Sequence, residues 1–588
     1  MKNWNLEKIY ANDDLWLKDF ATLKEEADKV SSFKGKLTTK EGLEAYYIYS
    51  ENFEKQLGKM YGYAHMKGDQ NQKITIYQDF QNKMRALIQT YVANASYVEN
   101  EILSKPYETY VEFAKNSTKI NEYLFNIKRI FDARKHILSP NEEKILANYQ
   151  LVSSAFGSLY AALQNGDAST FKVKLTSGEE IEVSTNTYTS VLQKLEKQED
   201  RRLVFEAQFA YYEKHKYTLA SIYKGVVDSN IAKMKSRGYN SVLELYLDSN
   251  KIPTDVFMSL INTVRKNTAP LKRYINLRKK LFGLDEYHTY DRFLAYSKAD
   301  VKYPYEKAVE DVFAAVKPMG EDFLEHAKRA LAEGHVDVYP AEGKRSGAYS
   351  THAEGYGPYI LLNHADTLDS AFTVAHECGH SIHTLYSTES QPYATKDYVI
   401  FVAEIPSTFN EQLFLDYLLK NSNNRELKIQ ALEQQMDGIV QTFYRQTLFA
   451  NFEYEAHRLS LEGESLNYEV LSKIMKDLYF DYYGIDLDTE PLKKFVWAYI
   501  PHMFYTPFYV YQYATCFSAS MKMYENVKNN VEGSKENYIK MLKAGASNYP
   551  VEIVKIGGVD LTSSEPFAAV CDKLDTLLDE YEKLINEA

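Results

Sequence analysis

Residues 375–383 read Ala375-His376-Glu377-Cys378-Gly379-His380-Ser381-Ile382-His383, and the rest of the sequence is interpreted from this stretch. Apolar residues continue on both sides of it at helical spacing, so the segment is predicted to be a helix. His376 and His380 are four residues apart and share one helix face, where both imidazoles can reach one zinc ion. Glu377 lies one residue further round, beside the open position of such an ion. There it can accept a proton from a bound water.

A catalytic zinc site needs a third protein ligand, and two residues are candidates. His383 lies on the same face, but about 10 Å along the helix axis from His376. One ion cannot easily bind both, so His383 is predicted to pack or to support a ligand. Glu404 lies in the apolar run 399–406, where an unpaired carboxylate is costly. A salt bridge would also stabilise it, but the favoured ligand set is His376, His380 and Glu404.

Two further carboxylates are candidates for holding a ligating imidazole in place. Glu411 lies two helical turns beyond Glu404 on the same face. Asp369 lies seven residues before His376 and is the alternative.

Outward from this motif, most of the sequence is predicted to be helical. Amphipathic stretches follow one another, and proline and glycine are sparse, at 15 and 25 residues. Residues 171–183 alternate around a turn and predict a β-hairpin. Two short strand-like pieces, 336–339 and 359–363, flank a glycine-rich loop just before the motif. We therefore expect a mainly α fold with a small β-sheet next to the zinc helix.

Composition excludes several classes of protein. The 588 residues include 81 acidic and 69 basic side chains, which gives a net charge of −12 and makes nucleic acid a poor partner. No window approaches 18 consecutive apolar residues, so a membrane span is not expected. Three cysteines cannot build a disulfide framework, and the polar N-terminus lacks an apolar signal core. These features predict a cytoplasmic protein.

The motif and the segments around it resemble a known enzyme family. Residues 375–383 followed by 401–407 are similar to the thimet oligopeptidase-like zinc metallopeptidases, and most similar to the oligoendopeptidase F group among them. The resemblance runs from about residue 190 to the end of the chain. It includes residues 346–350, 358–363, 502–515, 542–547 and 557–561.

The resemblance implies a large, two-lobed, mainly helical fold with a deep substrate channel. The resemblance begins near residue 190, after the hairpin at 171–183, so we expect an N-terminal helical lobe at 1–190 and a catalytic region at 191–588. It also implies one zinc ion on the predicted ligands, with Glu377 as general base on a zinc-bound water, and the hydrolysis of internal bonds in short peptides. A peptidase that trims from the C-terminus is an alternative, and a silent peptide-binding zinc protein is a weaker one. The oligomeric state is left open.

Residues 502–513 carry one histidine and four tyrosines, and the resembled family uses this segment to bind substrate and stabilise an oxyanion. A tyrosine hydroxyl stays protonated at neutral pH and can donate to such an oxygen. His502, Tyr509 and Tyr513 are the favoured residues and Tyr505 is next. A continuous helix would align the three tyrosines on one face. An aromatic core stripe is the alternative.

Substrate backbone is expected to bind at the predicted sheet. The strand at 358–363 precedes the zinc helix and could pair with an extended peptide by strand addition. Gly347, Tyr359 and Leu361 are the predicted substrate-binding residues of this region.

Overall fold

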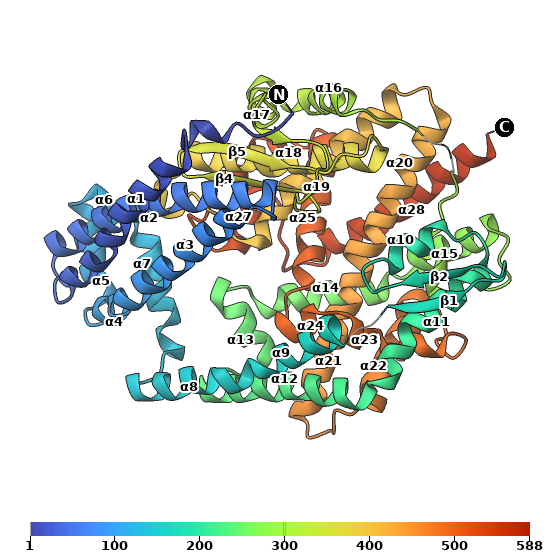
Figure 1. Cartoon of the computed structure of the whole chain (residues 1–588), viewed down its shortest axis with the longest axis horizontal. Helices are drawn as coiled ribbons and strands as arrows, with labels where there is room; N and C mark the ends of the chain where they lie inside the picture. The colour runs from blue at the N-terminus through green and yellow to red at the C-terminus, as the bar shows by residue number, and fades with distance from the viewer. Residues whose placement is uncertain (1, 168–169, 298, 300, 588) are drawn as a thin grey trace. The chain divides into compact units, whose positions relative to one another are not determined.

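The computed structural model describes residues 2–167, 170–297, 299 and 301–587. The chain divides into two compact units, each assembled from three segments. Unit 1 comprises residues 1–135, 301–423 and 520–559, and unit 2 comprises 136–300, 424–519 and 560–588. The described residues form mostly helices with two small sheets, so the predicted mainly α fold class is confirmed (Figure 1).

Unit 1 contains long helices at its N-terminus and around the metal motif. Its helices are α1 (Asp13–Ala27), α2 (Lys40–Gln70), α3 (Thr75–Asn94), α4 (Val98–Ile102), α5 (Tyr107–Lys115), α6 (Thr118–Glu122), α7 (Leu124–Ala133), α16 (Tyr305–Val316), α17 (Glu321–Ala330), α18 (Leu368–Ser390), α19 (Ile400–Asn421), α26 (Ser534–Leu542) and α27 (Pro550–Ile556).

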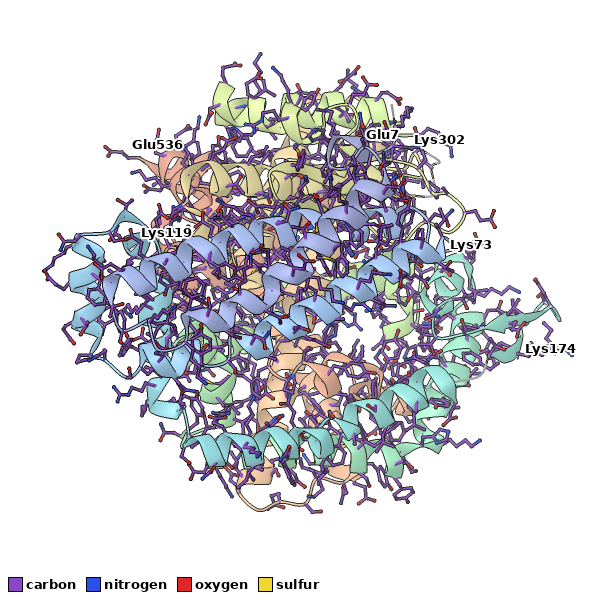
Figure 2. All side chains as sticks on the ribbon, turned by 60° about the vertical axis from the view of Figure 1, so that its left-hand side comes forward. Glu7, Lys73, Lys119, Lys174, Lys302 and Glu536 are labelled. Atoms are coloured by element: carbon purple, nitrogen blue, oxygen red, sulfur yellow. The ribbon has the colours of Figure 1, made fainter. Side chains whose placement is uncertain are left out.

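Helices α1 to α3 pack through apolar side chains that recur at helical spacing. Trp16 is fully buried between them, stacks on Phe80 at 3.9 Å between ring centroids, and donates its indole N–H to the carbonyl oxygen of Met60. Figure 2 shows these helices lying side by side, with Lys73 in the short link between α2 and α3. This helical layer forms a hydrophobic core together with the next element, the small sheet of unit 1.

A three-stranded sheet lies between this layer and α18. Its strands are β3 (Val336–Asp337), β4 (Tyr349–Ala353) and β5 (Tyr356–Leu361), in the order β3-β5-β4. β5 pairs in parallel with β3 and antiparallel with β4. The expected small sheet beside the zinc helix is present, but β4 was expected to be loop, because its Tyr-Ser-Thr-His-Ala sequence has no apolar alternation.

Unit 2 holds the remaining helices and a two-stranded hairpin. Strands β1 (Phe171–Lys174) and β2 (Glu180–Val183) pair antiparallel, as the alternation at 171–183 predicted. Lys174, at the end of β1, is labelled in Figure 2. The helices are α8 (Pro140–Ser153), α9 (Ala155–Ala161), α10 (Tyr188–Lys194), α11 (Gln198–Lys214), α12 (Lys216–Ser236), α13 (Val242–Leu247), α14 (Thr254–Lys266), α15 (Ala269–Leu281), α20 (Arg425–Gly438), α21 (Arg445–Leu461), α22 (Tyr468–Tyr483), α23 (Val496–Tyr499), α24 (His502–Tyr505) and α28 (Glu565–Asn586).

One further helix, α25 (Tyr511–Lys528), follows α24 after a short turn, and its residues are divided between the two units. None of the described helices is both long enough and apolar enough to cross a lipid bilayer.

Candidate metal centre

Helix α18 carries the two histidines of the motif on one face. The side chain of Thr367 caps its N-terminus by accepting a hydrogen bond from the backbone N–H of Ser370 at 3.2 Å. With the helix start fixed, His376 and His380 follow one turn apart, and their ring centroids are separated by 4.9 Å. The predicted helix and the shared face are both present.

Helix α19 brings Glu404 against these imidazoles. Glu404 Oε2 lies 3.4 Å from His376 Nε2 and 3.5 Å from His380 Nε2. These three side chains form a group that could hold a metal ion, with all three ligand atoms within 4.8 Å of one another. The hydroxyl of Ser407 donates to the same Glu404 oxygen at 3.1 Å and helps to fix the carboxylate.

A glycine allows the two helices to approach this closely. A Cβ at Gly379 would lie 2.4 Å from the carbonyl oxygen of Pro406 and 2.7 Å from Cα of Ser407, so no larger residue fits without a backbone shift. The side-chain amide of Asn410 also crosses between the helices and donates to the carbonyl oxygen of Ala375 at 3.3 Å. The contact between α18 and α19 therefore sets the position of the carboxylate relative to the histidines.

Glu411 fixes the orientation of His376. Its Oε1 accepts a hydrogen bond from Nδ1 of His376 at 2.5 Å, which leaves Nε2 directed at Glu404. Burial opposes the charged form of His376, but hydrogen bonds to Glu404 and Glu411 outweigh it and raise its pKa well above the usual value. Burial acts against the charge of Glu404 too, yet its bonds to both histidines lower its pKa. Asp369, the alternative partner, is exposed near the start of α18.

Glu377 is buried beside the two histidines, with 5% of its surface exposed. Its Oε2 atom has no hydrogen-bond partner among the described residues. Burial raises the pKa of this carboxyl, and the nearby His376 and His380 only partly offset that effect. A buried carboxylate oxygen without a partner is costly, which is typical of a group that meets a ligand.

His383 does not join the group. Its ring is completely buried and stacks on Tyr398 at 3.6 Å between centroids. Neither ring nitrogen has a hydrogen-bond partner among the described residues, and burial lowers the pKa of this histidine to about 3. A neutral, packed imidazole is what the distance along the helix predicted.

The donor set fits a zinc ion on geometric and chemical grounds. Tetrahedral ligands at about 2.0–2.1 Å from zinc are separated from one another by about 3.3–3.4 Å, close to the measured 3.4 and 3.5 Å. Without a metal, a proton on His376 Nε2 faces Glu404; once that proton is lost, Nδ1–H still donates to Glu411 and Nε2 directs a lone pair at the Glu404 carboxylate. Two acceptors that face each other are stabilised by a cation between them.

In unit 2, three of the four predicted residues in the tyrosine segment form a cluster. The ring of His502 lies 5.9 Å from Tyr509 and 6.3 Å from Tyr513, and the two tyrosine rings are 5.5 Å apart. All three side chains are half-buried. Burial lowers the pKa of His502, which favours its neutral form. Tyr505 instead lies beside Tyr160, with 46% of its surface exposed.

The expected continuous helix through these tyrosines is wrong. α24 ends at Tyr505, α25 begins at Tyr511, and Phe508 between them has a φ of 54°. A left-handed phenylalanine is strained, and a buried carboxylate stabilises it here: Glu453 accepts the Phe508 backbone N–H at 2.8 Å. Spacing alone could not reveal this turn. The sequence signal that was missed is a glutamate among the apolar residues of the 448–456 stretch.

The expected peptide-pairing strand is also wrong. β5 is the central strand, and the backbones of Ile360 and Leu361 already face β3 and β4. The side chains of Tyr359 and Leu361 are buried in the core, at 1% and 0% exposure. Gly347, with a φ of 83°, lies in the turn before β4. The strand at the edge of the sheet on this side is β4.

Comparison with known proteins shows which family the chain belongs to. A family model described as peptidase family M3 matches residues 191–572, which make up more than half of this chain. The chain belongs to peptidase family M3. A second model, described as oligopeptidase F, matches residues 101–169.

Relatives within the family cover nearly the whole chain. Oligopeptidase PepF of Bacillus subtilis is 35% identical over 584 residues, which cover 99% of this chain and 87% of the relative. Group B oligopeptidase PepB of Streptococcus agalactiae is 34% identical over 99% of this chain and 97% of its own. The crystal structure of oligoendopeptidase-F from Enterococcus faecium matches with a TM-score of 0.76 at 30% identity, over 98% of this chain and all of that one. The resemblance to oligoendopeptidase F is confirmed, and the chain is a peptidase of an oligopeptide-cleaving family.

Proposed function

We propose that this chain is a zinc-dependent endopeptidase that hydrolyses internal peptide bonds of short oligopeptides. One observation supports this more than any other. One Glu404 oxygen stands 3.4 and 3.5 Å from the Nε2 atoms of His376 and His380, all three donors lie within 4.8 Å of one another, and Glu377 beside them carries a buried oxygen without a partner among the described residues. In this proposal His376, His380 and Glu404 hold one zinc ion, and Glu411 orients His376. Asp369 is proposed to act only through Glu411, whose charge, after burial, raises the pKa of Asp369.

Zinc, when bound, acts as a Lewis acid that lowers the pKa of a water molecule and polarises a carbonyl oxygen. Glu377 is the general base: its Oε2 accepts the proton that the attacking water loses. The same oxygen then donates that proton to the nitrogen of the leaving amine. The buried surroundings of Glu377 raise its affinity for a proton, which suits a group that must carry one between two steps.

His502, Tyr509 and Tyr513 are proposed to bind the substrate and to donate hydrogen bonds to the carbonyl oxygen as it gains negative charge. Their rings already contact one another, so a substrate would meet them as one group. Tyr505 lies apart from this cluster and is proposed only as a peripheral substrate contact.

An extended substrate is proposed to pair with β4. An edge strand offers unpaired backbone groups, so this mode of binding tolerates many side chains. Gly347 shapes the turn that leads into β4, while Tyr359 and Leu361 support it from β5. The chain is further proposed to act in the cytoplasm, with 1–190 as an N-terminal lobe and 191–588 as the catalytic region. The three cysteines, which form no disulfide with one another, are compatible with that compartment.

The test is digestion of a peptide blocked at both ends, with and without a zinc chelator, followed by mass spectrometry of the products. We expect cleavage at internal bonds, its loss with the chelator, and its return when zinc is added. Cleavage of the same peptide with a free C-terminus, but not of the blocked peptide, would favour the C-terminal-trimming alternative. Undiminished cleavage without metal would contradict the proposal.

A further inference from the structure

Unit 2 contains a small cavity surrounded by three basic side chains. The cavity measures about 30 Å³, which is room for one or two water-sized groups. Arg292, Arg445 and Lys493 line it, together with the ring-bearing side chains of Tyr479 and Tyr483. All of these residues come from 136–300 and 424–519, so the cavity belongs to one unit.

The three cations are held close together. Oε1 of Gln441 accepts hydrogen bonds from Nη1 of Arg292 at 2.7 Å and from Nη1 of Arg445 at 3.3 Å. Nζ of Lys493 lies 5.8 Å from the ring centroid of Tyr479, which also lines the cavity. Arg445 follows directly after the π-helical turn Ile439–Tyr444, an irregularity that is often found at functional sites.

No described carboxylate neutralises these cations by direct contact. None of the three forms an ion pair within 4 Å with an acidic side chain of the described residues. The nearest acids are engaged elsewhere: Glu490 accepts the N–H and hydroxyl of Thr289, and Asp437 accepts the hydroxyl of Tyr274. The charge of Glu490 acts on Lys493 without direct contact, so one carboxylate faces a cluster of three cations, which is left short of negative charge.

Burial and repulsion within the cluster lower the pKa values of two of its basic groups. Burial, and then the neighbouring Arg292 guanidinium, lowers the pKa of Arg445 to about 10. The same two causes, in the same order, lower the pKa of Lys493 well below its usual value. An anion in the cavity would relieve both effects, because it would face all three charges at once.

We propose that this cavity is a binding site for one small monovalent inorganic anion of the size of chloride, held by Arg292, Arg445 and Lys493. A cavity of about 30 Å³ suits an ion of about the size of one or two waters better than a sulfate or a phosphate ester. The anion would couple the turn Thr289–Phe293, which carries Arg292, to α21 and to the turn Pro491–Phe495, which carries Lys493, and so stabilise this part of unit 2.

The experiment measures the melting temperature (Tm) of the full, metal-loaded chain in sodium chloride and in sodium gluconate at equal ionic strength. Gluconate is monovalent but too large for the cavity, so general salt screening is the same in both series. We expect chloride to raise Tm by at least about 1 °C over gluconate, with saturation. Arg445→Gln should abolish the difference. Arg458→Gln should retain it, because Arg458 lies on the same helix in an exposed pair with Glu455.

Crystals of the unmodified protein soaked in sodium bromide give a second measurement that does not depend on any variant folding. We expect an anomalous bromide peak in the cavity, within hydrogen-bond distance of Arg445 and Lys493. Equal Tm values in chloride and gluconate would overturn the proposal. So would bromide peaks at the protein surface with none in this cavity.

Discussion

Glu404 and His383 lie near the same histidines but in different surroundings. The carboxylate of Glu404 faces both Nε2 atoms, whereas the ring of His383 is packed flat against Tyr398. Glu404→Ala should therefore weaken metal binding by more than the about 10–100-fold that loss of a supporting residue causes. His383→Ala should leave metal affinity within about twofold and lower Tm instead, since it opens a cavity. Competition with a chelating dye measures both affinities, and the reverse order would mean that the ligand set is wrong.

Tyr509 and Tyr511 are two residues apart, yet only Tyr509 lies in the cluster with His502. Tyr511 is 98% buried and packs on Phe257 at 5.4 Å between ring centroids. Tyr509→Phe keeps the ring and removes the hydroxyl. If that hydroxyl donates in the transition state, kcat should fall by about 10²–10³, with a smaller change in KM.

Tyr511→Phe is the control for this loss, because it removes a hydroxyl in the core and should leave kcat near its original value. Steady-state kinetics with one blocked peptide compares the two variants. Equal small effects at both positions would favour the alternative that these tyrosines only pack in the core. A large effect of Tyr513→Phe, with none of Tyr509→Phe, would mean that Tyr513 of α25 is the hydrogen-bond donor.

At the scale of elements, the close contact between α18 and α19 has the most direct consequence. Gly379→Ala introduces a methyl group 2.4 Å from the Pro406 carbonyl oxygen, so the helices must separate and carry Glu404 away from the histidines. We expect metal affinity to fall by about 10-fold or more. Gly438→Ala is the control, since Gly438 ends α20 with nothing within 4 Å of an added Cβ, and should be neutral or stabilising. Chelator competition on both variants tests this, and equal affinities would contradict it.

The elements that could be predicted are those in which apolar residues recur at the spacing of a buried helix face or strand face. The helix around residues 375–383 and the hairpin at 171–183 follow directly from apolar spacing. Helix α19 begins at Ile400 and contains Pro406, a residue type that usually ends or kinks a helix, so local sequence does not predict where this helix begins. The turn at Phe508 depends on Glu453, a partner distant in sequence that no local pattern reports. Strand β4 pairs with β5, which follows it after two residues, but the sequence of β4 lacks the apolar alternation that predicts a strand.

The same limit applies to the candidate site. Spacing selected His376, His380 and Glu377 because one helix carries all three. Glu404 could be selected by its apolar surroundings, but its contact with the histidines depends on Gly379, whose role appears only when the two helices are packed.

At the scale of the whole molecule, stability should depend on pH through a buried carboxyl group. Glu453 is 1% exposed, and burial raises its pKa to about 8, although the Phe508 N–H partly offsets this. The unfolded chain releases this proton near pH 4.3. Between these values the folded state holds a proton that the unfolded state lacks, so stability falls as pH rises, by up to about 1.4 kcal/mol per unit.

Glu453→Gln removes this titration while keeping a group that accepts the Phe508 N–H. Its Tm should exceed that of the original protein increasingly from pH 5 to pH 8 and by a constant amount above pH 8. Glu455→Gln is the control, because Glu455 lies on the same helix in a partly exposed pair with Arg458. Parallel Tm curves for the Glu453 variant and the original protein across this range would contradict the prediction.

The division of the molecule into two compact units could not be predicted. Each unit combines three segments, and hydrophobic periodicity does not report which distant segments pack together. The predicted division into an N-terminal lobe at 1–190 and a catalytic region at 191–588 is a different one, and it stays a prediction. Family membership, in contrast, was predictable from a few short segments, because the residues that carry the chemistry are close together in sequence at 376–411.

The most direct test of the central claim is the Glu377→Gln variant, assayed together for zinc content and for turnover of a blocked peptide. The amide keeps the size of the side chain but cannot accept a proton. We predict about one zinc per chain, as in the original protein, and a turnover lowered by about 10²–10⁴-fold. Glu389→Gln, the same change on an exposed residue of α18, should alter neither. Turnover of Glu377→Gln close to that of the original protein would contradict the account.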